Sequence, residues 1–351
     1  MNPKLRLNNK DKLVLFADLN TMLGAGIPIL EAIESLASDA KGSLHKVLIE
    51  LRRSLNNGEN LARAMSRFPR AFEPVTVNLI RAAESGGTLE ETLQDIVRTT
   101  KKQAAFSTNL RTAMIYPAFV MTIFTGILIL LLTFVVPRLG QVFKSMHTKV
   151  PWATQQLMNA SSFFLAHWPF IVCGIIVAII LIATFVSHYK RTIIRWILSL
   201  PGLSHLGVTI DLARLTRSLA LLLKAGVPLE EALDLTKHTL SKKETIAVVE
   251  QMELSMSAGK PLATGLRDTD GVVPVMMARS METAEMSGTL EQTMQSLAEH
   301  FDEQAEEKLK VISSLIEPVM ILTAGLLVGS LMICVIAPIY NITSHFKPAG
   351  M

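Results

Sequence analysis

The chain contains the same sequence unit twice. Residues 19–34 read LNTMLGAGIPILEAIE and residues 219–234 read LALLLKAGVPLEEALD, with seven identities in sixteen positions. Two unrelated segments of average composition would share about one position in sixteen. A second match, at an offset of 201, pairs ESGGTLE at 84–90 with EMSGTLE at 285–291. This spacing is far longer than a solenoid repeat of roughly 20–50 residues, so the sequence predicts a duplicated domain.

Each copy of this domain is predicted to be all-helical. Leu13, Phe16, Leu19 and Leu23 recur at the spacing of one helix face. Breaks near 24–26, 41–42, 57–58, 69–74 and 85–87 divide the first copy into about six short helices. The sequence has few β-branched alternations, and no hairpin dipeptide lies between strand-like runs.

Three uncharged segments are long enough to cross a membrane, at 118–136, 168–187 and 319–337. A helix of 19 residues spans about 28 Å, close to the hydrocarbon thickness of a bilayer. Half of all residues are apolar, which agrees with membrane insertion. Prolines flank two of the spans, Pro117 and Pro137 the first, and Pro318 and Pro338 the third.

Basic residues set the expected orientation. Eight lie near the proposed cytoplasmic ends of the spans and four on the opposite side, which favours a cytoplasmic N-terminus. A polar start without a signal peptide agrees. The fold class is then an all-α membrane protein with two homologous cytoplasmic six-helix bundle domains and three transmembrane helices. The expected order is copy 1 at 1–112, a span at 113–137, a periplasmic loop at 138–167, a span at 168–188, copy 2 at 189–314, a span at 315–340 and a periplasmic tail at 341–351.

The charges of the two copies differ in sign. Residues 1–111 carry 16 basic and 12 acidic side chains, whereas residues 188–317 carry 14 basic and 18 acidic ones. The copies therefore attract each other, meet different partners, or carry solvated faces without a partner. No basic–aromatic patch indicates direct nucleic-acid binding.

Sequence patterns for catalysis, metal binding or nucleotide binding are missing. Gly259-Lys260-Pro261 is not a phosphate-binding loop, and no HExxH motif, nucleophile elbow or paired-cysteine site is present. No enzyme activity, cofactor or metal is therefore expected.

The first repeated motif, A-G-[IV]-P, predicts a tight corner between helices. Its residues are Gly26, Pro28 and Glu31 in copy 1, and Gly226, Pro228 and Glu231 in copy 2. Glycine can take the left-handed conformation that ends a helix, proline suits the first turn of the next helix, and the glutamate there favours the helix dipole.

The second repeated motif predicts another corner. Its residues are Glu84, Gly87 and Thr88 in copy 1, and Glu285, Gly288 and Thr289 in copy 2. Thr88 with Glu91, and Thr289 with Gln292, match a capping box. Capping does not require Glu84 or Glu285, so these carboxylates accept N–H bonds of the turn, bind a divalent cation or meet a partner protein.

Small residues in the spans predict helix-packing faces. Gly325 and Gly329 form a small-xxx-small pattern in the third span, and Thr122 with Gly126 has the same spacing in the first. Such a face allows a second helix to approach closely, either within the bundle or from another protein.

These repeated motifs, each copy leading into a span, resemble the type II secretion F protein family. The resemblance covers about residues 10–340, and the chain is most like the short members from type IVb pili; longer members carry an extra segment before the first domain. The family consists of inner-membrane platform proteins of type II secretion and type IV pilus machines. Some members have been associated with a divalent ion near positions matching Glu31 and Glu84. Here Thr88 is not acidic, so no metal is expected.

The resemblance implies a platform that couples a hexameric cytoplasmic ATPase to insertion of pilin or pseudopilin transmembrane helices. Other inner-membrane assembly proteins, membrane lipid and a second copy of the chain, with a dimer favoured, are the further expected partners. A transporter or permease subunit that forms a pore only as an oligomer is the alternative. A membrane-anchored enzyme is a third class, which no group of residues supports.

Overall fold

A computed structural model describes residues 5–113, 115–138, 141, 155–156, 158–159, 161–163, 165–167, 203–267, 269 and 271–345. Every regular element in these residues is helical, which confirms the all-α prediction. The chain divides into two compact units. The first unit comprises Met1–Asn109 and Ile194–Leu309, and the second comprises Leu110–Ile193 and Lys310–Met351.

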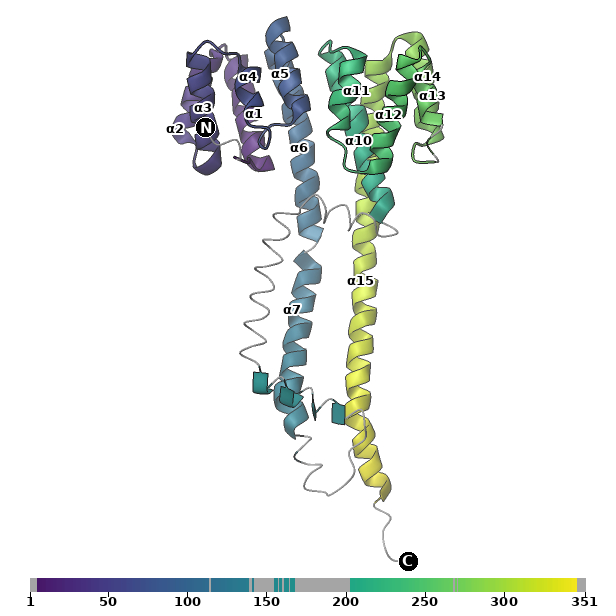
Figure 1. Ribbon diagram of the computed structural model, residues 1–351. Helices are drawn as coiled ribbons and strands as arrows, with labels where there is room; N and C mark the ends of the chain where they lie inside the picture. The colour runs from purple at the N-terminus through teal and green to yellow at the C-terminus, as the bar shows by residue number, and fades with distance from the viewer. Residues whose placement is uncertain are drawn as a thin grey trace, which may run out of the picture. The chain divides into compact units, whose positions relative to one another are not determined.

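Within the described residues, both copies of the repeat consist of six helices, which are labelled in Figure 1. In copy 1 these are α1 (Asn9–Gly24), α2 (Ile29–Asp39), α3 (Gly42–Asn56), α4 (Leu61–Ser66), α5 (Pro74–Gly86) and α6 (Leu89–Ala113). In copy 2 they are α10 (Leu203–Lys224), α11 (Leu229–Lys237), α12 (Lys243–Ser257), α13 (Leu262–Arg267), α14 (Val275–Ser287) and α15 (Leu290–His345). The helix breaks in copy 1 lie where the glycine and proline residues predicted them.

The A-G-[IV]-P corners are built on glycines with positive φ. Gly26 has φ 80° and Gly226 has φ 76°, a conformation that costs a residue with a Cβ free energy. Pro28 and Pro228 lie immediately before α2 and α11, with ψ angles of 145° and 141°. The expectation that proline occupies the first turn is therefore wrong by one position, because its extended ψ places it outside the helix.

The core of each copy is packed with large apolar side chains from several helices. In copy 1, Phe16 of α1 and Phe72 meet edge to face, with ring centroids 6.1 Å apart, a geometry that aromatic rings favour. In copy 2, Met252, Met277 and Met281 are almost fully buried. Burying such a side chain stabilises the fold by roughly 1.5–3 kcal/mol, and residues of both copies belong to one buried apolar cluster.

The copies differ in how closely the short fourth helix approaches the third. In copy 2, a Cβ added at Gly265 of α13 would lie 2.5 Å from the carbonyl oxygen of Gln251 in α12. The equivalent residue in copy 1 is Ala64, which is buried at 1% exposure. Helices α12 and α13 therefore approach within a distance that only glycine permits.

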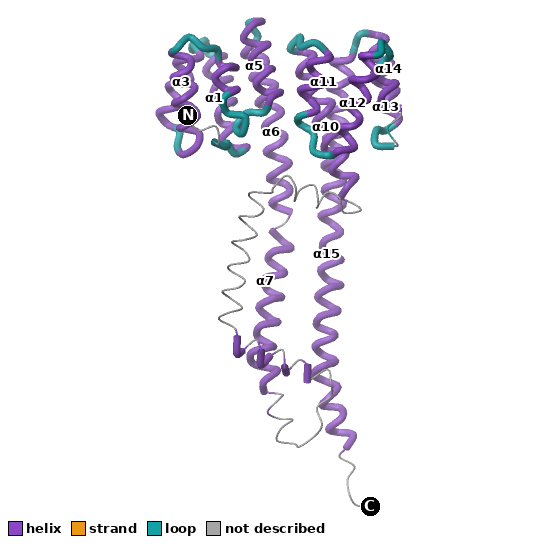
Figure 2. Tube along the Cα trace, in the orientation of Figure 1, coloured by secondary structure: helices purple, strands orange, loops and turns teal. Residues whose placement is uncertain are grey.

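The second unit contains α7 (Ile115–Leu130), which continues into a π-helical turn, η1 (Leu131–Val135). Figure 2 shows the helical course of α7 and α15. Two helical segments, Ile115–Arg138 and Leu290–Leu326, are long and apolar enough to cross a membrane. The predicted first span, 118–136, lies in one of them. The predicted third span, 319–337, lies in α15, and the predicted second span, 168–187, lies outside the described residues.

We expect Gly265→Ala to destabilise copy 2 by about 1–3 kcal/mol, because the methyl group overpacks against the backbone of α12. The midpoint of thermal unfolding, followed by circular dichroism of the full chain in detergent, should fall. Gly86→Ala is the matched control: this glycine ends α5 without positive φ, and its nearest contact for a Cβ is 3.7 Å away. An unchanged midpoint in Gly265→Ala would contradict the close approach.

Candidate functional site

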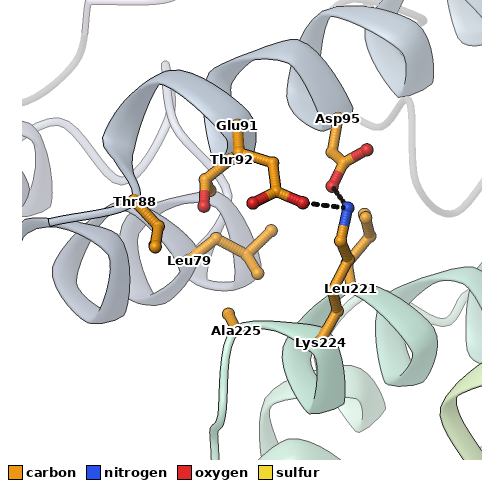
Figure 3. Close-up of a pocket in the computed structure, with 8 residues that line it drawn as sticks. All are labelled: Leu79, Thr88, Glu91, Thr92, Asp95, Leu221, Lys224 and Ala225. Atoms are coloured by element: carbon orange, nitrogen blue, oxygen red, sulfur yellow. Dashed lines mark hydrogen bonds and ion pairs between the residues drawn. The ribbon is translucent and has the colours of Figure 1, made fainter. Parts of the chain in front are cut away.

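The two copies meet inside the first unit through α5 of copy 1 and α10 and α11 of copy 2. A pocket of about 160 Å³ opens at this junction. Figure 3 shows the side chains that line it: Leu79, Thr88, Glu91, Thr92 and Asp95 from copy 1, and Leu221, Lys224 and Ala225 from copy 2. Lys224 and Ala225 belong to the end of α10 and the start of the A-G-V-P corner, so a predicted corner lines the pocket.

Lys224 connects the copies through two carboxylates. Its Nζ lies 2.7 Å from Oδ2 of Asp95 and 3.0 Å from Oε1 of Glu91, and Figure 3 shows it between them. The helix ends favour this arrangement, because Glu91 lies in the first turn of α6 and Lys224 in the last turn of α10. We call this group the Lys224 clamp.

The clamp raises the pKa of Lys224 above its ordinary value of 10.5, first through the hydrogen bond to Asp95 and then through the bond to Glu91. A raised lysine pKa means that the folded state binds the proton more tightly than the unfolded state. The resulting stabilisation is present in full below pH 10.5 and is lost as the pH rises through the folded-state value. The lysine side chain is 40% exposed, so solvent screens the pair.

Further contacts join α6 to copy 2. Arg98 lies 3.4 Å from Glu299, and Lys102 lies 3.2 Å from Asp302. Asp302 also binds Arg217 of α10. These contacts follow the net charges of the copies, basic on copy 1 and acidic on copy 2, whereas the Lys224 clamp has the opposite polarity. The copies thus attract each other through specific pairs rather than through net charge alone.

Glu84 of α5 holds the start of the short helix α4. Its Oε1 accepts the N–H of Leu61 at 2.6 Å, and its Oε2 accepts the N–H of Ala62 at 3.0 Å. The side chain of Asn60 accepts the next N–H, from Arg63, at 3.3 Å. The first N–H groups of a helix have no partner within the helix, and here each of these three has an acceptor.

Glu285 makes the equivalent contact in copy 2, where its Oε2 accepts the N–H of Leu262 at 2.8 Å. The acceptor role is one of the three uses that the sequence left open for Glu84 and Glu285. The N–H groups come from α4 and α13, 22 or 23 residues earlier in the chain, rather than from the neighbouring turn.

The predicted capping boxes at Thr88 and Thr289 do not form. The N–H of Thr88 donates to the carbonyl of Ala83 at 3.0 Å, and that of Thr289 donates to Ala284 at 2.9 Å. In a capping box, the side chain of the residue three positions later accepts the N–H of the cap residue. Here the left-handed Gly87, with φ 71°, ends α5 so that the N–H of Thr88 bonds back to α5 instead. The carboxylate of Glu91 is therefore available to Lys224.

The remaining corner residues lie at the helix ends where they were predicted. Glu31 and Glu231 are exposed in the first turns of α2 and α11, and Gly288 has φ 70°. Within the described part of the chain, no three acidic, histidine or cysteine side chains come together in a geometry that could hold a metal ion.

The membrane candidates lie on α7 and α15 or directly after η1. Pro117 is in the first turn of α7, Gly126 is inside α7, and Pro137 lies in the helical residues after η1. Pro318, Gly325, Gly329 and Pro338 all lie within α15. A Cβ added at Gly126, Gly325 or Gly329 meets no described atom within 4 Å.

Sequence reasoning missed the Lys224 clamp and the π-helical turn. Part of the clamp was recognisable in the sequence, because Glu91 and Asp95 lie four residues apart and therefore on one face of α6. Their partner Lys224, however, is 129 residues from Asp95 in the chain. The π-helical turn has a polar partner, since the hydroxyl of Ser161 donates to the carbonyl of Leu132 at 2.5 Å. Neither pairing follows from helix periodicity.

We expect Glu84→Ala to cost about 2–4 kcal/mol of stability, because two charge-assisted bonds are lost and two N–H groups of α4 are left without acceptors. Asn60→Ala removes one cap and should cost about 1 kcal/mol. Urea unfolding of the full chain in detergent measures both. Equal effects of the two substitutions would show that the carboxylate does not hold α4.

We expect Lys224→Glu to loosen the junction, because it places a third carboxylate beside Glu91 and Asp95. Two exposed ion pairs contribute about 0.2–1 kcal/mol each, so amide hydrogen exchange in α5 should accelerate about 2- to 30-fold. Combining Lys224→Glu with Asp95→Lys should restore slow exchange. Lys237→Glu is the control, since Lys237 pairs with Glu253 inside copy 2 and should leave α5 unchanged. Failure of the double reversal to restore protection would contradict the clamp.

Comparison with known proteins places the duplication in a described family. The family model for "Type II secretion system (T2SS), protein F" matches residues 15–137 and again residues 215–338. Each match includes one six-helix copy, apart from its start, and the predicted span that follows it. The family model thus matches the chain twice, once over each copy of the repeated motifs.

Curated relatives span nearly the whole chain. The type 4 fimbrial assembly protein PilC of Pseudomonas putida is 30% identical over 330 residues, covering 93% of this chain and 82% of the relative. The type IV pilus assembly protein PilC of Thermus thermophilus is 29% identical, covering 95% and 82%. The type II secretion system protein F of Xanthomonas campestris is 26% identical, covering 98% and 87%. The chain therefore belongs to the type II secretion system protein F family.

Proposed function

We propose that this protein is an inner-membrane platform of a type IV pilus or type II secretion machine. In this role it couples a cytoplasmic assembly ATPase to the insertion of pilin or pseudopilin subunits. Its two repeated domains lie in the cytoplasm, its N-terminus is cytoplasmic and its C-terminus is periplasmic. Family membership supports this assignment, because the relatives are named for pilus assembly and for type II secretion.

The observation that carries the proposal is the continuity of α15. This helix begins at Leu290 in copy 2 and runs to His345, so it contains the predicted third span, 319–337. Its first part is fixed to copy 2 by buried Met294, Leu297 and Phe301. A displacement of copy 2 by an ATPase would pass into α15, since this helix has no loop between copy 2 and the predicted span.

The pilin or pseudopilin subunit would contact the face of α15 that carries Gly325 and Gly329. In lipid, exchange of one apolar neighbour for another changes little hydrophobic free energy, so helix recognition depends on close packing. Gly325 and Gly329 are exposed among the described residues, and they allow a close approach. We therefore assign this face to the apolar helix of a pilin or pseudopilin.

We expect Gly325→Leu with Gly329→Leu to leave the protein in the membrane and its ATPase bound, but to abolish filament or pseudopilus assembly. Membrane fractionation, co-purification of a hexameric ATPase with the tagged full chain, and counts of filaments measure these three properties. Thr323→Leu is the control, since helix periodicity places Thr323 on the opposite side of α15.

Normal filament numbers in the glycine double variant would remove this face from the mechanism. Absence of any ATPase or pilin-like protein from the wild-type complex would contradict the platform function itself. Recovery of a substrate-binding partner instead would favour the transporter alternative.

A further inference from the structure

The first predicted span changes its hydrogen-bond pattern near its end. Helix α7 is α-helical, and η1, which follows it directly, is π-helical. The N–H of Val136 donates to the carbonyl of Leu131, five residues earlier, whereas an α-helix would direct it to the carbonyl of Leu132. Such turns are rare and occur mostly as single bulges inside α-helices, frequently at functional sites. This turn therefore needs a physical cause.

The proline that follows η1 supplies that cause. In an α-helix, the ring of Pro137 would clash with the carbonyl of Thr133, four residues earlier, and would offer it no N–H. A π-helical turn inserts one extra residue into the helix and avoids this clash. In the π-helical pattern, however, the carbonyl of Leu132 looks for its donor five residues later, and that residue is again Pro137. The backbone therefore leaves the Leu132 carbonyl without a donor.

The hydroxyl of Ser161 supplies the missing donor. Its Oγ lies 2.5 Å from the carbonyl oxygen of Leu132, and Ser161 is only 2% exposed. Val136, beside the same turn, is also 2% exposed, whereas Ile127 and Phe134 of this span are 50% and 62% exposed. Within a membrane an unpaired carbonyl is costly, so the hydrogen bond from Ser161 stabilises the π-helical turn.

A homologous helix in the same chain passes its proline in the α-helical pattern. Pro338 is the counterpart of Pro137 at the offset of 201, and α15 is α-helical around it. Proline at this position of a span is therefore compatible with either pattern. What differs at the first span is the hydroxyl of Ser161, which bonds to the one carbonyl that only the α-helical pattern would otherwise pair.

We propose that the carbonyl of Leu132 switches the first span between two registers. In the π-helical register it accepts the hydroxyl of Ser161, and in the α-helical register it accepts the N–H of Val136. The change removes one residue from the bulge, so it turns α7 by about 100° relative to the end of the span. Thr122 and Gly126, which lie on α7, then face different neighbours.

The switch links the chain after the first span to the orientation of α7. A force or a partner that draws Ser161 away from Leu132 favours the α-helical register. By linkage, a contact that holds α7 in the orientation of the α-helical register favours release of Ser161 to the same extent. This inference concerns a conformational device, goes beyond the proposed function and does not depend on it.

The test measures thiol reactivity in the full chain in detergent, in a background with Cys173→Ser and Cys334→Ser. Val136→Cys should react slowly with N-ethylmaleimide, because Val136 is buried, and Val135→Cys should react faster, because Val135 is half-buried. In the α-helical register Val135 takes the place around the helix that Val136 has now. Ser161→Ala should therefore accelerate the reaction of Val136→Cys about tenfold, the shift expected for one lost hydrogen bond, and slow that of Val135→Cys.

Two further variants complete the design. Ser162→Ala is the matched control, because the hydroxyl of Ser162 donates to the carbonyl of Asn159 in its own segment, and it should change neither rate. Pro137→Ala removes the ring clash, so it should populate the α-helical register and exchange the two rates even with Ser161 present. Adding Ser161→Ala to Pro137→Ala should then change neither rate further.

The exchange of rates distinguishes a change of register from simple loosening. If Ser161→Ala accelerates the reaction at both positions, Ser161 only packs against the span and the proposal is overturned. Unchanged rates in Ser161→Ala overturn it as well. Wild-type rates in Pro137→Ala would show that proline does not set the register, and they too would overturn the proposal.

Discussion

Each repeat depends on a carboxylate that holds a helix too short to be stable alone. Helix α4 has six residues, and isolated helices below about 12–15 residues are marginal in water. Glu84 supplies acceptors for its first two N–H groups and ties α4 to α5. Glu285 holds α13 in the same way. With α4 and α13 fixed, α3 and α12 have a surface to pack against, and α5 and α14 are held at the position where the next long helix begins.

Periodicity and turn chemistry predicted most of the fold. Gly26 and Gly226 marked corners because only glycine takes a positive φ at little cost, and uncharged runs marked the helices that can cross a membrane. Both are local properties of the chain. The capping box at Thr88 was wrong for an equally local reason: two motifs compete for one N–H, and the glycine that ends α5 takes it. Residues 168–187 lie outside the described part of the chain, so the second span stays a prediction.

The candidate site was predictable only in part. The A-G-V-P corner of copy 2 was identified from the repeat, and it lines the pocket at the junction. Lys224 was not identified, because its importance depends on Glu91 and Asp95, which are distant in sequence. The repeat itself held a signal: Lys224 aligns with Gly24, and Asp95 with Ser296. Positions where two copies differ in charge indicate where the copies have different neighbours.

The contact between Arg98 and Glu299 joins equivalent positions of the two copies, 201 residues apart. In a dimer of two identical chains, a position that meets its own counterpart across a twofold axis must present the same residue on both sides. Arginine would face arginine, or glutamate would face glutamate, and like charges would repel. Joining both copies in one polypeptide removes this restriction, because each position can then mutate independently. Covalent fusion thus makes available an attractive pairing that a symmetric dimer of identical domains could not form. It also fixes which copy supplies the arginine and which supplies the glutamate.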